Sequence, residues 1–136
     1  MTMLDRHATT ASGNRARWAG RILGGLVVVA LAADAAGKLI APQTMIANSP
    51  PLGLPADPAL YRTIGAILVG CLALHVWPRT AVLGAVLLTG FLGGAVAVNV
   101  RAGMPLFGNT LFGAYIGILL WAGLWLRDAR VRAMLG

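Results

Sequence analysis

Four long runs of hydrophobic residues, separated by polar or proline-rich segments, dominate the chain. The runs cover about residues 18–40, 60–77, 80–100 and 106–126. Each is close to the roughly 20 residues that an α-helix needs to cross a hydrocarbon core of about 30 Å. The pattern therefore predicts an all-α integral membrane protein, with a single four-helix bundle over residues 15–136.

The segments outside these runs predict less regular structure. Residues 1–14 are polar and aperiodic, which indicates a disordered cytoplasmic tail. Residues 41–58 contain five prolines, namely Pro42, Pro50, Pro51, Pro55 and Pro58. Proline fixes the φ angle and removes the backbone N–H donor. We therefore expect an extramembrane loop through which no regular helix continues.

Composition supports a membrane protein. Of the 136 residues, 58% are hydrophobic and 11% are charged, whereas about 25% of the residues of a typical soluble domain are charged. A soluble globule of this size has a large surface and needs polar side chains to cover it. The composition therefore excludes a soluble single domain, a disordered chain and a collagen-like fibre.

The basic residues predict how the helices are oriented. The formal net charge is +7, and the arginines flank the hydrophobic runs, as they do in membrane proteins that gather them on the cytoplasmic side. A nucleic-acid-binding protein would instead place them along one polar face, so we expect no nucleic-acid partner. With the N-terminus inside, the cytoplasmic flanks hold Arg6, Arg15, Arg17, Arg21, Arg79, Arg127, Arg130 and Arg132, and the outer flanks hold Arg62 and Arg101. We therefore predict an N-in/C-in topology.

Small residues recur at four-residue spacing in three of the runs. These pairs are Gly20/Gly24, Gly90/Gly94 and Gly113/Gly117, with Gly93/Ala97 as a further pair. Lipid tails are as apolar as leucine, so membrane helices associate through close packing, which small residues permit. The spacing predicts a tight bundle, and space for a flat ligand is the alternative.

Polar residues of all four runs are predicted to meet at the outer side. Asp34 and Lys38 lie four residues apart in the first run, at the spacing that favours an ion pair on a helix. The other members of the set are Tyr61, Arg62, Asn99, Arg101, Asn109 and Thr110. Ionisable groups inside a membrane are costly and need a partner or a function.

Two interpretations of this polar set remain open. In the structural one, Lys38 or Arg101 neutralises Asp34, and Asn99 bridges helices. In the functional one, the residues form a pocket for a lipophilic molecule with a polar head, with Asp34 as a candidate general acid or base. The ligand-binding candidates are then Asp34, Lys38, Tyr61, Asn99, Arg101 and Asn109.

The remaining reactive side chains carry weaker signals. Cys71 is the single cysteine and lies in a hydrophobic run, so it is predicted to pack in the core. His75 lacks a second ligand at metal-binding spacing, so we predict an interfacial histidine and no metal site. The sequence contains no phosphate-binding loop and no nucleophile elbow.

The stretch PRTAVLGAVLLTGFLGGAVAVNVRAGMPLF, residues 78–107, resembles the signature of the DoxX-like family of small four-span bacterial membrane proteins. The motifs Asp-Ala-Ala-Gly-Lys at 34–38, Leu-Gly-Leu-Pro at 52–55 and Leu-Arg-Asp at 126–128 agree with it. The family commonly has Thr-His where this chain has Val98 and Asn99. This difference removes an imidazole and leaves Asp34 as the candidate for proton transfer.

The resemblance implies a multi-pass protein of the bacterial plasma (inner) membrane. Relatives are associated with sulfur or thiol oxidation and with quinone-linked membrane redox complexes. We therefore expect a protein that binds a lipophilic molecule, with a quinone as the candidate cofactor, as an accessory subunit of a redox system. Its expected partners are membrane lipid and either a redox protein or a second copy.

Two alternatives to this function stay open. One is a membrane-embedded isomerase, cyclase or epoxide-opening enzyme in which Asp34 is the general acid and Lys38 tunes it. The other is a purely structural or assembly protein.

Overall fold

The computed structural model describes residues 2–49 and 51–136, and within them it contains helices and no strands. The elements in chain order are α1 (Met3–Ile40), α2 (Pro42–Asn48), α3 (Pro58–Val76), α4 (Ala81–Arg101), the π-helical turn η1 (Leu106–Thr110), α5 (Phe112–Arg127) and α6 (Ala129–Leu135). Four candidate spans are long and apolar enough to cross a membrane: Arg6–Ile40, Pro58–Val76, Ala81–Arg101 and Leu106–Arg127. The predicted all-α fold with four spans is confirmed.

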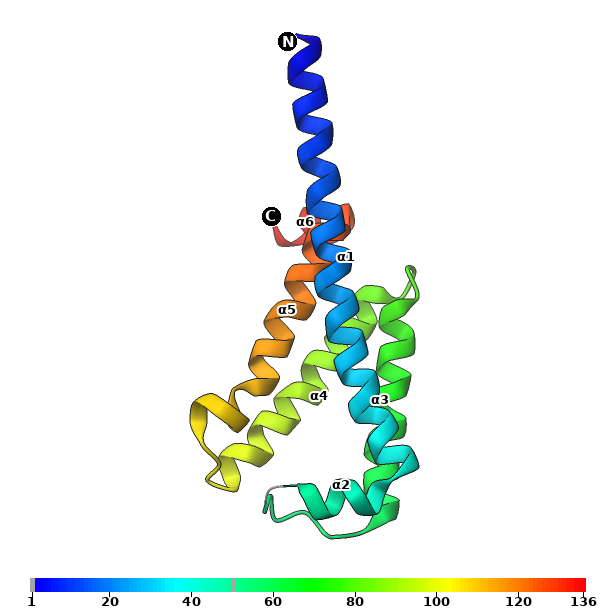
Figure 1. Ribbon diagram of the computed structural model, residues 1–136, viewed down its shortest axis with the longest axis vertical. Coiled ribbons are helices and arrows are strands. Elements are labelled where there is room, and N and C mark those ends of the chain that lie inside the picture. The colour runs from blue at the N-terminus through cyan, green and yellow to red at the C-terminus, as the bar shows by residue number, and fades with distance from the viewer. Residues whose placement is uncertain (1, 50) are drawn as a thin grey trace.

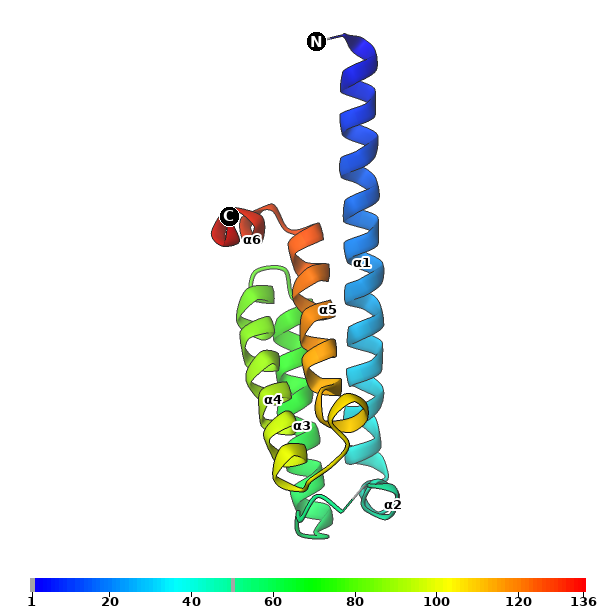
Figure 2. The ribbon, with the colours of Figure 1, turned by 90° about the vertical axis from the view of Figure 1, so that its left-hand side faces the viewer.

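The four long helices form a bundle in which α1 and α4 lie diagonally. Helix α1 packs against α3 and α5, and α4 packs against the same two helices. Figure 2 shows α3 and α5 between α1 and α4. We call the end with α6 and both chain termini the terminal end, and the end with α2 and η1 the loop end (Figure 1).

The first helix begins much earlier than the sequence predicts. It is continuous from Met3, so the prediction of a disordered tail over residues 1–14 is wrong for residues 3–14, and Met1 lies outside the described residues. No proline interrupts this segment, and the Thr10 hydroxyl donates to the Arg6 carbonyl at 2.9 Å. Extending a helix that a membrane span has already nucleated costs far less than starting one. The extension projects beyond the bundle (Figures 1 and 2).

The proline-rich loop contains a short helix that the sequence did not predict. Helix α2 starts at Pro42, in the first turn, where the missing N–H would have no partner in any case. Arg101 Nη2 donates to the carbonyls of Leu52 and Gly53, each at 3.4 Å, so the loop folds back onto α4. Gly53 has a φ of +69°, which a glycine adopts readily. Pro50 lies outside the described residues.

The core lies between the four long helices, and many other apolar side chains face outward. Leu68, Leu88 and Leu120 are fully buried at 0% exposure. By contrast, Leu26 and Ile118 are 64% and 67% exposed. Outward apolar side chains would be unfavourable in water over so large an area and suit contact with lipid.

Close helix crossings occur at some of the predicted glycines. A Cβ added to Gly20 would lie 2.8 Å from the Gly123 carbonyl oxygen, and one added to Gly113 would lie 3.0 Å from the Leu92 carbonyl oxygen. The packing prediction is therefore confirmed for α1 against α5 and for α5 against α4. It is wrong for Gly90, Gly93 and Gly94, where an added Cβ would meet nothing within 4 Å.

Candidate functional site

Asp34 and Lys38 form an ion pair along one side of α1. The Lys38 side chain is 16% exposed and the Asp34 side chain is 37% exposed. Gly65 of α3 lies close to this turn, because a Cβ there would be 3.0 Å from the Lys38 Cβ. The predicted pairing of these two residues is confirmed, and it uses a single helix.

The other predicted site residues lie at the same end but bond elsewhere. Asn99 Nδ2 donates to the Ala95 carbonyl of its own helix at 2.8 Å, and Arg101 binds the loop. Tyr61 is buried at 7% exposure, and Asn109 is exposed in η1. Within the described chain no hydrogen bond or ion pair joins any of them to Asp34 or Lys38. The diagonal placement of α1 and α4 explains the separation of Asp34 from Asn99 and Arg101.

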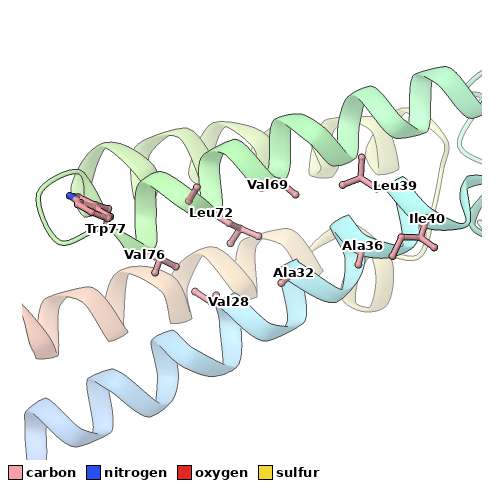
Figure 3. Close-up of a pocket in the computed structure, with 10 residues that line it drawn as sticks. Val28, Ala32, Ala36, Leu39, Ile40, Val69, Leu72, Val76 and Trp77 are labelled. Atoms are coloured by element: carbon pink, nitrogen blue, oxygen red, sulfur yellow. The ribbon is translucent and has the colours of Figure 1, made fainter.

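An apolar groove of about 490 Å³ runs between α1 and α3 (Figure 3). Apart from the indole N–H of Trp77, its lining side chains carry only hydrocarbon; they are Val28, Ala32, Ala36, Leu39 and Ile40 of α1, and Val69, Leu72, Ala73, Val76 and Trp77 of α3 or the turn after it. From Val28 to Ile40 the groove follows α1 for about 18 Å, at 1.5 Å per residue. Alanines at four-residue spacing between larger side chains are the sequence signal for this hollow, and our sequence reasoning missed it.

The groove and the ion pair occupy different faces of α1. Asp34 is two residues from both Ala32 and Ala36, and Lys38 is two residues from Ala36 and Ile40. Residues two apart on an α-helix do not face the same way, because successive side chains turn by about 100°. The polar group predicted for the head of a ligand pocket is therefore not part of the groove.

His75 lies inside the bundle, not at the membrane interface as the sequence predicted. It is 1% exposed, its Nδ1 lies 3.1 Å from the Ala81 carbonyl oxygen, and its Nε2 lies 3.2 Å from Arg127 Nη2. A carbonyl oxygen only accepts and a guanidinium only donates. The contacts therefore select the neutral tautomer that donates from Nδ1 and accepts at Nε2.

The Arg127 side chain extends this contact to a third helix. A Cβ added to Gly24 of α1 would lie 3.7 Å from Arg127 Nη1. The pair of His75 and Arg127 thus connects α1, α3 and α5, and the Ala81 carbonyl adds α4. Sequence reasoning missed the pair because the two residues are 52 positions apart.

Comparison with known proteins identifies the family. The model of the DoxX-like family matches residues 22–123, which is most of the chain. This chain belongs to the DoxX-like family. The searches of curated proteins and of solved structures returned no match. The matched region of this multi-pass membrane protein includes both walls of the groove, the Asp34–Lys38 pair and His75.

In this DoxX-like protein a second polar contact between helices lies near the middle of α4 and α5. Trp121 Nε1 donates to Thr89 Oγ1 at 2.8 Å, and the Thr89 hydroxyl donates to the Ala85 carbonyl at 2.7 Å. Cys71 is a free, buried thiol in the core cluster. Among the side chains that the structure describes, no three of His, Cys, Asp or Glu lie close enough together to hold a metal ion.

Helix α6 of the DoxX-like protein is fastened across the terminal end. Asp128 Oδ1 accepts from the Arg130 N–H at 2.9 Å, and Arg130 Nη2 donates to the Pro78 carbonyl at 3.0 Å. The side-chain hydrogen bond from Arg130 is the main reason why the pKa of the Asp128 carboxyl is held below its usual value. Val131 is fully buried against the core. The α3–α4 turn and the end of α5 are therefore joined through α6.

Proposed function

We propose that this DoxX-like membrane protein holds a small lipophilic molecule in the groove between α1 and α3. The observation that carries the proposal is the apolar lining of the groove along about 18 Å of α1. Its volume of about 490 Å³ lies within the range of roughly 300–1,000 Å³ that is usual for ligand pockets.

In a membrane, the burial of apolar area contributes little to the free energy of binding, so the shape of the surface decides where an apolar molecule binds. Lipid tails already surround the helices with hydrocarbon, so selective association depends on close packing. Ala32, Ala36 and Ala73 leave the hollow that a slender apolar molecule can fill, with Leu72 and Val76 beside it. The gain comes from the sum of many van der Waals contacts.

The finer part of the proposal concerns the ligand and its setting. A quinone is the candidate ligand, because the family resemblance links relatives to quinone-linked redox complexes. The protein would then be an accessory subunit of a redox system in a bacterial plasma membrane, working with a redox partner or a second copy. The arginine-rich flanks support the placement of both termini in the cytoplasm.

The test is to identify small molecules that co-purify with the protein in mild detergent. We expect lipophilic compounds in the organic extract of the wild type, and at least a tenfold loss in Ala32→Phe and Ala73→Phe, which fill the groove from its two walls. Tenfold corresponds to about 1.4 kcal/mol of binding free energy. Ala97→Phe is the matched control, because Ala97 is exposed and lies outside the groove. Equal extracts from all four proteins would refute the proposal.

The intramembrane ion pair favours a second candidate function, a membrane-embedded enzyme. A carboxylate and an ammonium held together in a span are costly unless they have a purpose. In this alternative Asp34 is the general acid, Lys38 tunes it, and Tyr61, Asn99, Arg101 and Asn109 bind the ligand at the loop end. Loss of turnover of a lipophilic substrate in folded Asp34→Asn would support it. A change in abundance alone would indicate a structural role.

A further inference from the structure

The two ends of the α1–α3 groove differ in chemistry. At the loop end the wall of α1 finishes with Leu39 and Ile40, which are apolar. At the terminal end Trp77 lines the groove and is 64% exposed. Arg79, which is also exposed, follows two residues later. The groove is therefore apolar at one end and leads towards an aromatic side chain and a cation at the other.

Helix α1 contributes a second cation on the same side. Arg21 precedes Val28 by seven residues, which is about two helical turns and about 10 Å along the axis. It therefore lies on the groove face of α1, beyond the terminal end of the groove in the direction of the N-terminus. The Arg21 guanidinium carbon lies 5.9 Å from the ring centroid of Trp18, and both residues are exposed.

Among the side chains that the structure describes, no carboxylate forms an ion pair with either of these two arginines. The ion pairs in the described part of the chain are Lys38 with Asp34 and Arg130 with Asp128. Arg21, on the groove face of α1, and Arg79, in the turn that follows Trp77, therefore supply uncompensated positive charge at the terminal end. Trp18 and Trp77 accompany them, and tryptophan is enriched at the boundary between lipid and water.

We infer that the groove binds a membrane phospholipid with an anionic headgroup, whose phosphate lies between Arg21 and Arg79. The inference rests on the proposed function, that the groove holds a lipophilic molecule, and it assigns a phospholipid as the occupant in place of the quinone that the family resemblance implies. One acyl chain would follow the groove, whose length of about 18 Å is close to one leaflet, half of a hydrocarbon core of about 30 Å. The headgroup then reaches the two arginines at the terminal end.

Charge explains why the headgroup should be anionic. Guanidinium groups form strong, directional hydrogen bonds to phosphate oxygens. A zwitterionic headgroup carries an ammonium that the same arginines repel. A quinone has an uncharged head and gains little from them. The preference should therefore depend on Arg21 and Arg79 and not on the apolar lining.

In the test, the full chain is delipidated and then supplied with phosphatidylglycerol and phosphatidylcholine. Native mass spectrometry compares how much of each lipid the protein retains. We expect the wild type to prefer phosphatidylglycerol by about thirtyfold, equivalent to about 2 kcal/mol for two cations at the membrane surface. Arg21→Gln/Arg79→Gln should reduce this preference to below about threefold. Arg6→Gln/Arg15→Gln is the matched control, because it removes the same charge from exposed arginines of α1 that lie about 9 Å or more beyond Arg21 along the helix axis, and it should keep the preference.

The groove-filling variants separate this inference from the proposed function. If Ala32→Phe and Ala73→Phe lower retention of both lipids but the wild type shows no headgroup preference, the inference is wrong and the groove still binds lipophilic molecules. A preference that survives Arg21→Gln/Arg79→Gln, or that the control pair also abolishes, overturns the inference in the same way. If the groove-filling variants leave retention unchanged, both ideas are wrong.

Discussion

His75 and Arg127 bring a cation and an imidazole into the packed terminal end of the bundle, where each depends on the other. A buried charged donor that loses its acceptor costs more free energy than the intact hydrogen bond contributes. The contrast with Asp34 and Lys38 is instructive, since that pair lies within one helix and holds no second helix in place. At the scale of single residues, the contact across helices is therefore the one that stabilises the fold.

His75→Leu should destabilise the protein by about 2–4 kcal/mol, because it leaves the Arg127 guanidinium and the Ala81 carbonyl without partners. Unfolding by SDS in mixed micelles measures the change. The double variant His75→Leu/Arg127→Met is the control: it removes both partners and should be more stable than the sum of the single changes predicts. Strict additivity would show that the two side chains do not interact.

The Asp128 carboxyl gives a pH dependence whose sign follows from its lowered pKa. Its contribution is fully present above the ordinary value of about 4 and is lost as pH falls through the lower folded-state pKa. The pair with Arg130 is partly exposed, so the contribution is at most about 1 kcal/mol. Asp128→Asn should be slightly less stable than the wild type at pH 7, and the difference should shrink as the pH falls below about 4. Thermal unfolding in detergent measures both, and a difference independent of pH would contradict the assignment.

At the scale of helices, two glycines of α4 have opposite surroundings. A Cβ on Gly84 would lie 2.2 Å from the backbone nitrogen of His75, while one on Gly90 would meet nothing within 4 Å. Backbone atoms cannot move aside as a flexible side chain can, so Gly84 determines how closely α4 follows α3. The small residues of α4 that face outward do not hold the bundle together.

Gly84→Ala should therefore destabilise the bundle by about 3 kcal/mol or more, as overpacking does. Gly90→Ala makes the same chemical change in the same helix and should leave stability unchanged or raise it by up to about 1 kcal/mol through helix propensity. Yield of monodisperse protein and the melting temperature measure both variants. Equal yields and melting temperatures of the two variants would show that Gly84 of α4 does not lie against the backbone of α3 at His75.

At the scale of the whole molecule, both termini lie at one end of the bundle (Figure 1). The arginine-rich flanks of that end predict that it faces the cytoplasm. Cysteine labelling in intact cells tests this orientation with Ser12→Cys in α1 and Gln43→Cys in α2, both at exposed positions. The native Cys71 is buried and gives little background.

A membrane-impermeant maleimide should label Gln43→Cys in intact cells and Ser12→Cys after the membrane is opened. The reverse order would place the termini outside. It would also place the arginine-rich end of the groove in the outer leaflet. The labelling result therefore indicates which leaflet supplies the bound phospholipid.

Local features of the chain explain which predictions succeeded. The spans were predictable because the length and hydropathy of a crossing helix are properties of one segment. The Asp34–Lys38 pair was predictable because helix geometry alone brings residues four apart together. Helix α2 and the first residues of α1 were not predicted. Helix α2 begins with a proline, which the sequence pattern associates with a break in a helix, and the start of α1 is polar and has no hydrophobic periodicity.

The sequence by itself determined the family, the number of spans, the common side of the two termini and the ion pair within α1. Only the tertiary structure decided which helices are neighbours, and hence that Asn99 and Arg101 lie diagonally from Asp34, that His75 meets Arg127, and that a groove opens between α1 and α3. The physical reason is that these contacts depend on how each helix is rotated and crossed. Backbone approaches such as Gly20 with Gly123 and Gly84 with His75 set those angles, and hydrophobic periodicity does not encode them.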